Sequence, residues 1–211
     1  MEFAVVGWPE ADPTLDLDHR RFAYAGKFVM STTGKAVARD AGTLVGAVAF
    51  DADRTDPETL RLRYVTVRDD RRGEAIGPRL CAFVVDRARE RGYERARIAV
   101  NNPFAYEALY KAGFGYTGER TGLAELVLER PSPRSPNAYR EGMAVYADRD
   151  LDEPAASFAA DRCDGDPPPL LDGVDPGVVA EGTGGTGPGT EGAGSDTDGT
   201  TGDEAVREDH G

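Results

Sequence analysis

The sequence predicts a mixed α/β (α+β) domain, built on a mostly antiparallel sheet and followed by a disordered acidic tail. Short segments of alternating apolar and polar residues follow one another early in the chain. A strand-like, a helix-like and a second strand-like segment then occupy 60–101. From about Asp164 the chain is rich in Gly, Pro, Thr and acidic residues, which bury too little apolar area to offset the entropy of ordering. We therefore expect a domain over 1–150 and a tail over 151–211.

The expected elements follow from residue periodicity and from turn residues. The first are strands at 3–8, 35–40, 44–51, 60–67 and 96–101, one or two short helices within Leu15 to Met30, and a helix at 77–91. The later ones are a helix from Pro103 to Gly113, a hairpin of 116–120 and 123–130, and a last strand from Tyr139 to Tyr146. Ala41-Gly42 suits a hairpin turn, and Gly46 indicates a bulge or a close backbone approach.

The most informative stretch is the loop between the strand at 60–67 and the helix that follows. A helix N-terminus has unpaired backbone N–H groups and the positive end of the helix dipole, so a phosphate or diphosphate is its natural ligand. Gly73 and Gly77 would let the backbone approach such an anion closely, and Arg71 and Arg72 add positive charge.

Two motifs in this region resemble those of the GNAT superfamily of N-acetyltransferases. The run Arg72-Gly73-Glu74-Ala75-Ile76-Gly77 resembles motif A, with Ala75 in place of the family's middle glycine. The run from Asn101 to Phe114, NNPFAYEALYKAGF, resembles motif B. The motifs stand in the family's order, with a helix and a strand between them.

The resemblance implies a GNAT-like fold with a six- or seven-stranded sheet, helices on both faces and a central parallel strand pair that splays apart. It also implies an acyltransferase that moves an acetyl group from acetyl-CoA, its co-substrate, to an amine of a small molecule or protein. The pantetheine arm would pair with the splayed strand like an added strand. The cofactor-binding residues it implies are Val65, Val67, Arg72, Gly73, Ala75, Ile76, Gly77 and Asn102.

The resemblance assigns catalysis to Tyr110, whose phenol would donate a proton to the departing thiolate. Asn102 stands one residue farther from Tyr110 than the family's asparagine does. It is nevertheless the residue assigned to the cofactor contact, with Asn101 as the competitor. No general base is assigned, because the strand at 60–67 has no glutamate where many relatives place one. Glu119, Asp51, Glu107 and a water chain stay open as alternatives.

The acceptor amine is not specified by the sequence. Trp8, His19, Tyr24 and Phe28 are candidate substrate contacts, with packing against the sheet as the competing interpretation for each. Arg61 and Arg63 would suit an acidic acceptor, but a solvent-facing strand edge explains them equally well.

Composition narrows the range of partners and locations. A formal net charge of -13 argues against nucleic acid and anionic membranes as partners. An acidic surface with few lysines leads to the hypothesis of a halophilic source. The apolar N-terminus reads as a strand and not as a signal peptide, so we expect a cytoplasmic protein. The two cysteines form no disulfide framework, Cys81 reads as a buried inert thiol, and no metal site is expected.

Two other functional hypotheses compete with an N-acetyltransferase. A non-catalytic acyl-CoA-binding regulatory domain would fit Ala75 and the missing strand carboxylate. An interaction protein that works through its acidic tail would lose function when the residues after Asp164 are removed, whereas an enzyme should tolerate that cut. A homodimer could form through an edge strand at 139–146.

Overall fold

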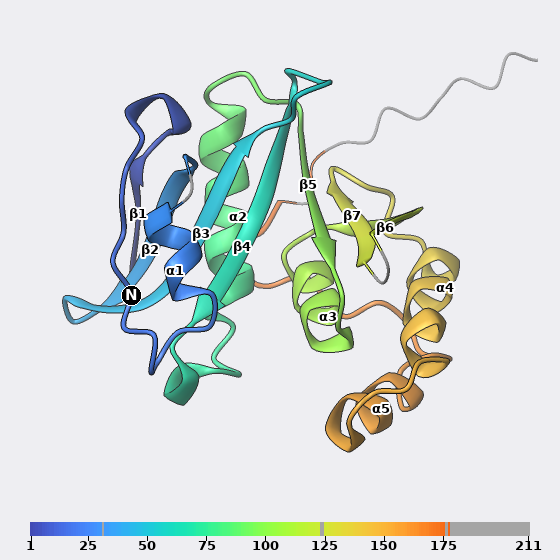
Figure 1. Ribbon diagram of the computed structural model, residues 1–211. Helices are drawn as coiled ribbons and strands as arrows, with labels where there is room; N and C mark the ends of the chain where they lie inside the picture. The colour runs from blue at the N-terminus through green and yellow to red at the C-terminus, as the bar shows by residue number, and fades with distance from the viewer. Residues whose placement is uncertain (31, 123–124, 176, 178–211) are drawn as a thin grey trace, which may run out of the picture. The chain divides into compact units, whose positions relative to one another are not determined.

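The computed structural model describes residues 1–30, 32–122, 125–175 and 177, and its centre is a seven-stranded sheet (Figure 1). The strands are β1 (Glu2–Gly7), β2 (Gly34–Asp40), β3 (Thr43–Ala52), β4 (Thr59–Val67), β5 (Arg95–Val100), β6 (Gly115–Thr121) and β7 (Glu125–Arg130). The helices are η1 (Pro9–Ala11), α1 (Ala25–Met30), η2 (Asp69–Arg71), α2 (Ile76–Arg89), α3 (Pro103–Lys111), α4 (Pro136–Ala147) and α5 (Glu153–Ala160). These elements belong to the first of two units, Met1–Val179; the second, Ala180–Gly211, lies outside the described residues.

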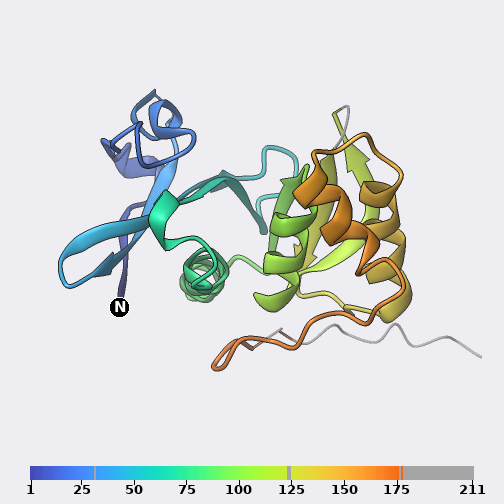
Figure 2. The same cartoon turned by 90° about the horizontal axis from the view of Figure 1, so that it is seen from below.

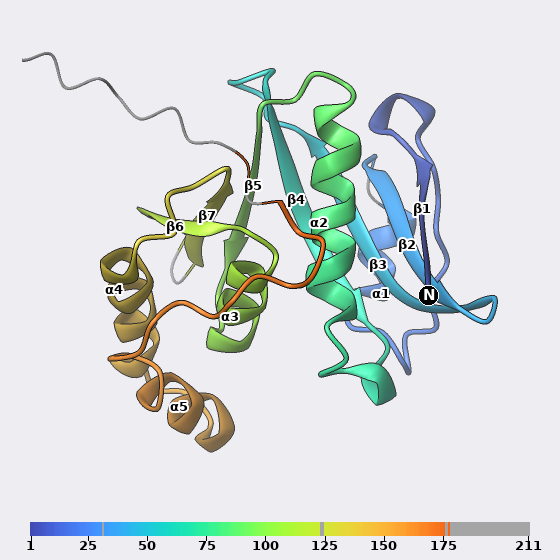
Figure 3. The same cartoon turned by 180° about the vertical axis from the view of Figure 1, so that it is seen from behind.

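The strand order is β1-β2-β3-β4-β5-β7-β6, and every neighbouring pair is antiparallel except β4 and β5. Helix α1 lies on one face of the sheet and α2 on the other, as Figures 1 and 3 show from opposite sides. The mixed α/β fold class predicted from the sequence, with a central parallel pair in a mostly antiparallel sheet, is therefore confirmed.

The turn between β2 and β3 follows from its two residues. Ala41 and Gly42 have φ values of 46° and 78°, both in the left-handed region that a tight hairpin turn requires. Gly46 combines the two roles expected of it. The β2–β3 pairing shifts beside it, between Ala38 and Arg39, and a Cβ at Gly46 would lie 3.0 Å from Cγ2 of Ile76. The glycine thus lets the start of α2 lie close against β3.

Each face of the sheet has its own apolar core. The larger core joins α2, α3 and α4 to side chains such as Leu60, Leu62 and Ile98. The smaller core joins Phe28 of α1 to the opposite face of β2 and β3. Of the one or two helices expected between Leu15 and Met30, α1 alone is present in the described part of that stretch. No helix among the described residues is both long enough and apolar enough to cross a membrane.

Helix α4 corrects one sequence prediction. A strand was predicted at Tyr139 to Tyr146, but Tyr139, Met143 and Tyr146 are buried at a spacing that matches one helix face. The side chain of Ser135 caps the helix by accepting a hydrogen bond from the backbone N–H of Ala138, at 3.1 Å, and Pro136 suits the first helical turn. The prediction was wrong because only a loose alternation was weighed. The edge strand expected to support a homodimer is therefore absent from this segment.

The ordered chain continues beyond the boundary that composition placed at residue 150. Helix α5 packs on α3 and α4, and the rings of Phe104 and Phe158 lie 4.5 Å apart. The following segment, 165–175, which we call the C-terminal strap, crosses toward α2 (Figure 3). Its hydrogen bonds join Gly165 O to Arg140 Nε (3.0 Å), Pro168 O to Arg134 Nη2 (2.8 Å), Leu171 N to Lys111 O (3.0 Å) and Asp175 O to Arg130 Nη2. Disorder was predicted from about Asp164 onward. Residues 178–211 of that stretch lie outside the described residues.

The strap changes the expectation that the domain tolerates a cut after Asp164. We predict that a chain ending at Asp164 loses about 2–4 kcal/mol of unfolding free energy, because buried Arg130 and partly buried Arg134 each lose a carbonyl partner. A chain ending at Val179 should match the full chain. Urea unfolding of the three proteins measures this, and equal midpoints for both truncations would contradict it.

Candidate functional site

The site begins where the parallel strands β4 and β5 separate. Their pairing runs from Thr59 opposite Arg95 to Leu62 opposite Ile98 and stops there. Beyond that point β4 remains paired with β3, and β5 remains paired with β7, so each strand stays in the sheet while the two diverge (Figure 1). The backbone groups of β4 that face β5 after Leu62 consequently have no strand partner. An extended ligand can occupy such an edge as an added strand.

A β-bulge marks the point of separation. Phe50 of β3 pairs with Leu62, but the next residue back, Ala49, pairs with Tyr64, so Arg63 is an extra residue in β4. A bulge bends its strand and increases the local twist. It also breaks the alternation of faces, so Arg63 and Tyr64 can line the same space.

A cavity of about 310 Å³ opens from this gap toward α2 and α3, and we call it the helix-side cavity. It is lined by Tyr24, Arg63, Tyr64, Val65, Gly77, Pro78, Cys81, Ile98, Ala99, Val100, Asn101, Asn102, Ala105, Ala108, Leu109 and Glu125. Figure 2 shows α2 and α3 on either side of this region. Burial raises the pKa of the Cys81 thiol to about 12, so the thiol stays protonated and unreactive.

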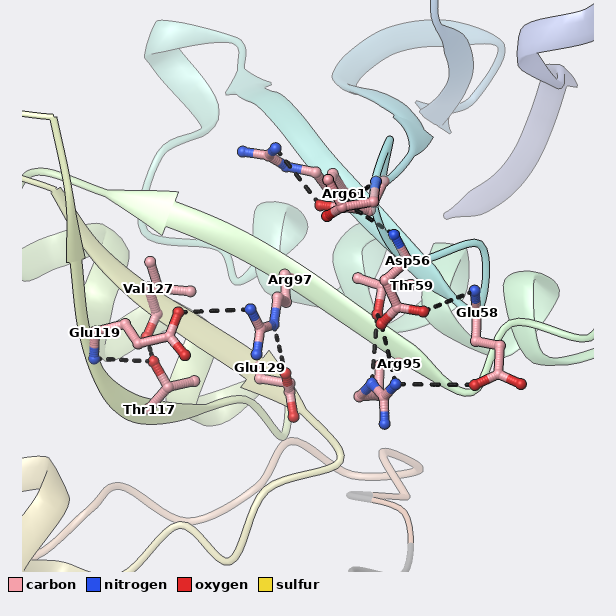
Figure 4. A network of polar contacts seen from close by, with 12 residues as sticks. Asp56, Glu58, Thr59, Arg61, Arg95, Arg97, Thr117, Glu119, Val127 and Glu129 are labelled. Atoms are coloured by element: carbon pink, nitrogen blue, oxygen red, sulfur yellow. Dashed lines mark hydrogen bonds and ion pairs between the residues drawn. The ribbon is translucent and has the colours of Figure 1, made fainter. Parts of the chain in front are cut away.

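A second cavity of about 420 Å³, which we call the charged cavity, lies on the other face of the strands. Its walls are Asp53, Arg61, Leu62, Arg63, Tyr64, Arg97, Ile98, Ala99, Glu119, Arg120, Thr121, Glu125 and Val127. Figure 4 shows part of this wall, where Arg97 lies between Glu129 and Glu119. Its Nε donates to Glu129 at 2.5 Å and its Nη1 lies 3.5 Å from Glu119.

The two cavities share part of their lining. Arg63 and Tyr64 from the bulge, Ile98 and Ala99 from β5, and Glu125 from β7 line both of them. Molecules bound on opposite faces of the sheet would therefore approach each other where β4 and β5 part. Such a junction is suited to a reaction between two bound substrates.

The N-terminus of α2 lies against the β4 side of the helix-side cavity. Gly73 has a φ of 88° and Ala75 a φ of 57°, and no side chain caps the helix. The first-turn amides of Ile76 and Gly77 have no intrahelical acceptor, and Pro78 has no N–H. A Cβ on Gly77 would lie 3.4 Å from Val67 and 3.8 Å from Val65. The structure thus brings the predicted residues of β4 and of the loop together.

The arginines of this loop are engaged by carboxylates. Arg71 bonds Glu74 at 2.7 Å and Asp40 at 3.0 Å, and these two partners, Glu74 first, raise its pKa. Arg72 forms an ion pair with Asp69 on the exposed surface. Any attraction for an anion here comes mainly from backbone amides and the helix dipole.

Asn102 stands at the other side of the same cavity, as the N-cap of α3. Its Oδ1 accepts a hydrogen bond from the backbone N–H of Ala105 at 2.8 Å, and its Nδ2 donates to Asn101 at 3.3 Å. Both asparagines line the helix-side cavity. Asn102 therefore has a structural role, and its amide group also faces the cavity.

Tyr110 lies apart from the other predicted site residues. Its side chain is fully buried, and it is not among the described residues that line either cavity. Its hydroxyl accepts a hydrogen bond from the backbone N–H of Tyr116 at 2.9 Å and another from the Tyr106 hydroxyl at 3.4 Å. Burial raises its pKa. The structure thus places the phenol in an aromatic core beneath α4 and not beside the gap between β4 and β5.

The helix explains this displacement. Successive residues of an α-helix are turned by about 100°, so one extra residue after the N-cap moves a side chain to a different face. The cavity face of α3 consists of Ala105, Ala108 and Leu109. Leu109 therefore faces the cavity, whereas Tyr110, one residue farther along the helix, faces the core.

The carboxylates considered as a base lie in different environments. Glu119 lines the charged cavity and pairs with Arg97. Asp51 lines neither cavity, its Oδ1 is buried without a hydrogen-bond partner, and burial raises its pKa. Glu107 is buried and accepts a hydrogen bond from the Tyr139 hydroxyl at 2.6 Å, so it belongs to the core.

Glu125 is a site residue that the sequence analysis missed. It is the only carboxylate among the described residues that lines both cavities. A signal was present in the sequence, since Glu125, Val127 and Glu129 alternate with buried Leu126 and Leu128 along β7. That alternation places Glu125 on the face of the charged cavity.

The four candidates for acceptor contacts, Trp8, His19, Tyr24 and Phe28, lie in different environments. Tyr24 lines the helix-side cavity, and its ring lies 6.0 Å from that of Tyr64. Phe28 of α1 is buried against β2 and β3, and the ring of Trp8 lies 5.1 Å from that of Phe50. His19 lies in an exposed turn.

Comparison with known families decides the assignment. The model of the Acetyltransferase (GNAT) family matches residues 2–116, more than half of the chain. The chain belongs to the GNAT family. This match covers β1 through the start of β6 and includes the separated strands, the α2 loop and α3.

Solved structures similar to this GNAT chain have low sequence identity. A PaiA N-acetyltransferase from Thermoplasma acidophilum in complex with coenzyme A is 20% identical, with a TM-score of 0.40 over 45% of this chain and 58% of that one. Nourseothricin acetyltransferase is 25% identical, with a TM-score of 0.41 over 46% and 64%. An IAA acetyltransferase from Bacillus cereus is 17% identical, with a TM-score of 0.46 over 61% and 98%. The chain thus spans less than two thirds of the first two, and no curated protein sequence matches it.

The position of Tyr110 leads to a prediction about its removal. Tyr110→Phe should lower the unfolding free energy by about 1–3 kcal/mol, because the buried N–H of Tyr116 loses its acceptor. Turnover of acetyl-CoA should change by less than about threefold. Urea unfolding and steady-state kinetics of the same preparation test both statements. A large loss of kcat at unchanged stability would instead restore Tyr110 as the proton donor.

Proposed function

We propose that this chain transfers an acetyl group from acetyl-CoA to an amine. The pantetheine arm would lie along the free edge of β4 near Val65 and Val67, in the helix-side cavity. The diphosphate would lie at the loop Arg72, Gly73, Ala75, Ile76 and Gly77, where the α2 amides are unpaired. Asn102, with Asn101 beside it, would contact the cofactor from α3.

One observation supports this proposal above the others. The parallel pairing of β4 and β5 stops at Leu62 and Ile98, and the helix-side cavity opens beyond that stop. A pantetheine arm has amide groups that can pair with a free strand edge, and a thioester at its end. When the arm lies along β4, the thioester is near the junction of the two cavities.

The reaction would follow ordinary acyl transfer. The amine nitrogen attacks the thioester carbonyl carbon, a C–N bond forms, the C–S bond breaks, and the CoA thiolate leaves with the electron pair. A backbone N–H at the β4 bulge would stabilise the negative charge that develops on the carbonyl oxygen. A thiol has a pKa of about 8.5, so its thiolate can leave and take a proton from water in the open cavity without a phenol.

A non-catalytic acyl-CoA-binding domain is the second candidate. The buried hydroxyl of Tyr110 and the absence of a glutamate from β4 favour it. Release of free CoA from acetyl-CoA across a panel of amines, at low and high salt, separates the two functions. Amine-dependent release supports the enzyme. Binding of acetyl-CoA by calorimetry without release under any condition would support the binding domain.

A matched pair of glycine variants tests the diphosphate site. Gly73 and Gly92 have nearly the same φ, 88° and 91°, and an added Cβ would meet no atom within 4 Å at either position. Gly73→Ala and Gly92→Ala should each cost about 1 kcal/mol of stability through the left-handed backbone. Only Gly73→Ala should weaken binding of CoA, by about tenfold, because it shifts the loop amides.

Calorimetry with CoA and with pantetheine, which has no phosphate group, completes this test. The pantetheine affinity should be similar in both variants, because pantetheine has no diphosphate. Equal CoA affinities in the two variants would place the diphosphate elsewhere.

A further inference from the structure

Four arginines of the described chain line the charged cavity, Arg61, Arg63, Arg97 and Arg120, and they differ in their partners. Arg61 pairs with Asp53 at 3.5 Å, and Arg97 pairs with Glu129 and Glu119. Arg63 and Arg120 form no hydrogen bond or ion pair with any described residue. In a chain with a net charge of -13, two unpaired guanidinium groups in one cavity mark a place suited to an anion.

Strand irregularities place both arginines on this wall. Arg63 is the extra residue of the β4 bulge. In β6 the pairing with β7 jumps from Tyr116 to Arg120 while β7 advances from Leu128 only to Leu126, and Gly118 between them has a φ of 85°. Regular strands would turn alternate residues away, yet the adjacent residues Glu119, Arg120 and Thr121 all line the cavity. Bulges beside a site are a common means of directing side chains into it.

Glu125 provides a negative charge in the same region as Arg63 and Arg120. It is partly buried, it lines both cavities, and its carboxylate forms no hydrogen bond or ion pair with any described residue. It therefore lies at the junction, whereas Arg120 lines the charged cavity alone. The cavity thus offers a negative group, Glu125, and a positive group, Arg63, at the junction, and a second positive group, Arg120, in the charged cavity alone.

We propose that the acceptor is a small amine that also has an anionic oxygen group, a carboxylate or a phosphate. Arg63 and Arg120 bind the anion, and Glu125 binds the ammonium group at the junction. This inference rests on the proposed acetyl transfer. A volume of about 420 Å³ is in the range of small-molecule sites.

Glu125 also acts as the base in this arrangement. Its carboxylate takes one proton from the substrate ammonium, which leaves a neutral amine with a free electron pair. That pair attacks the thioester carbon, the C–S bond breaks, and the thiolate leaves. The nitrogen then loses a second proton to solvent, and the products are the N-acetyl compound and CoA.

Paired substrates test the recognition. Amino acids are compared with their amides, and phosphoethanolamine with ethanolamine, by CoA release from the full chain. We expect kcat/KM to be at least about tenfold higher for the anionic member of one of these pairs. A preference for neutral amines or for polyamines would overturn the proposal.

Variants connect this preference to the named residues. Arg63→Gln and Arg120→Gln should each lower kcat/KM for the anionic amine by about tenfold or more and leave the neutral amine nearly unchanged. Glu125→Gln should lower kcat for every amine by about 100-fold, with partial recovery in Glu125→Asp. Arg87→Gln and Glu90→Gln remove the same charges from a surface ion pair on α2 and should change neither value. An equal loss for both amines in the arginine variants would contradict anion recognition.

A binding measurement keeps this test separate from that of the proposed function. If no amine releases CoA, acetyl transfer fails as a function. The anion site is then tested by titrating phosphoethanolamine into the CoA-loaded protein. Weaker binding to Arg63→Gln and Arg120→Gln than to Arg87→Gln would still support the site, and equal or absent binding would overturn it.

Discussion

The end of the hydrogen-bonded ladder between β4 and β5 is the constraint on which the site depends. After Leu62 and Ile98, β4 stays paired with β3, and β5 stays paired with β7. Because those antiparallel pairings continue, the strands can separate without leaving the sheet. Backbone groups that would be costly to bury unpaired are thereby kept at an open edge, where a ligand can satisfy them.

Local sequence rules predicted most of the framework. The turn residues Ala41-Gly42, the proline at Pro103 and the glycine at Gly92 each specify a backbone conformation that the structure contains. The loop from Gly73 to Gly77 was identified because its glycines would let the backbone approach an anion, and in the structure Gly77 lies close to Val67 and Val65 of β4. Predictions of this kind succeed because proline fixes its own φ angle and glycine permits a left-handed φ that other residues disfavour.

The failures involve side-chain direction, which depends on neighbours distant in sequence. Tyr110 matched a motif residue, but its side chain is turned into the core, where it contacts Tyr106 and the backbone of Tyr116. The α4 segment was predicted as a strand because the burial of its tyrosines depends on packing against α3 and β6, which are distant in sequence. The alternation along β7 was present in the sequence, but the cavities that Glu125 lines depend on the pairing of β7 with β5. Periodicity shows which element forms but not which cavity a side chain faces.

Arg130 links the two halves of the divided sheet from behind. It lies at the end of β7, donates to Asp86 of α2 at 3.1 Å, and also bonds the carbonyl of Asp175 in the C-terminal strap. The strap in turn holds the end of α3 through Lys111. These contacts therefore connect β7, on one side of the gap between β4 and β5, to α2 on the other. Arg130 lines neither cavity, so a residue outside both binding spaces helps to hold the flanks of the gap in place.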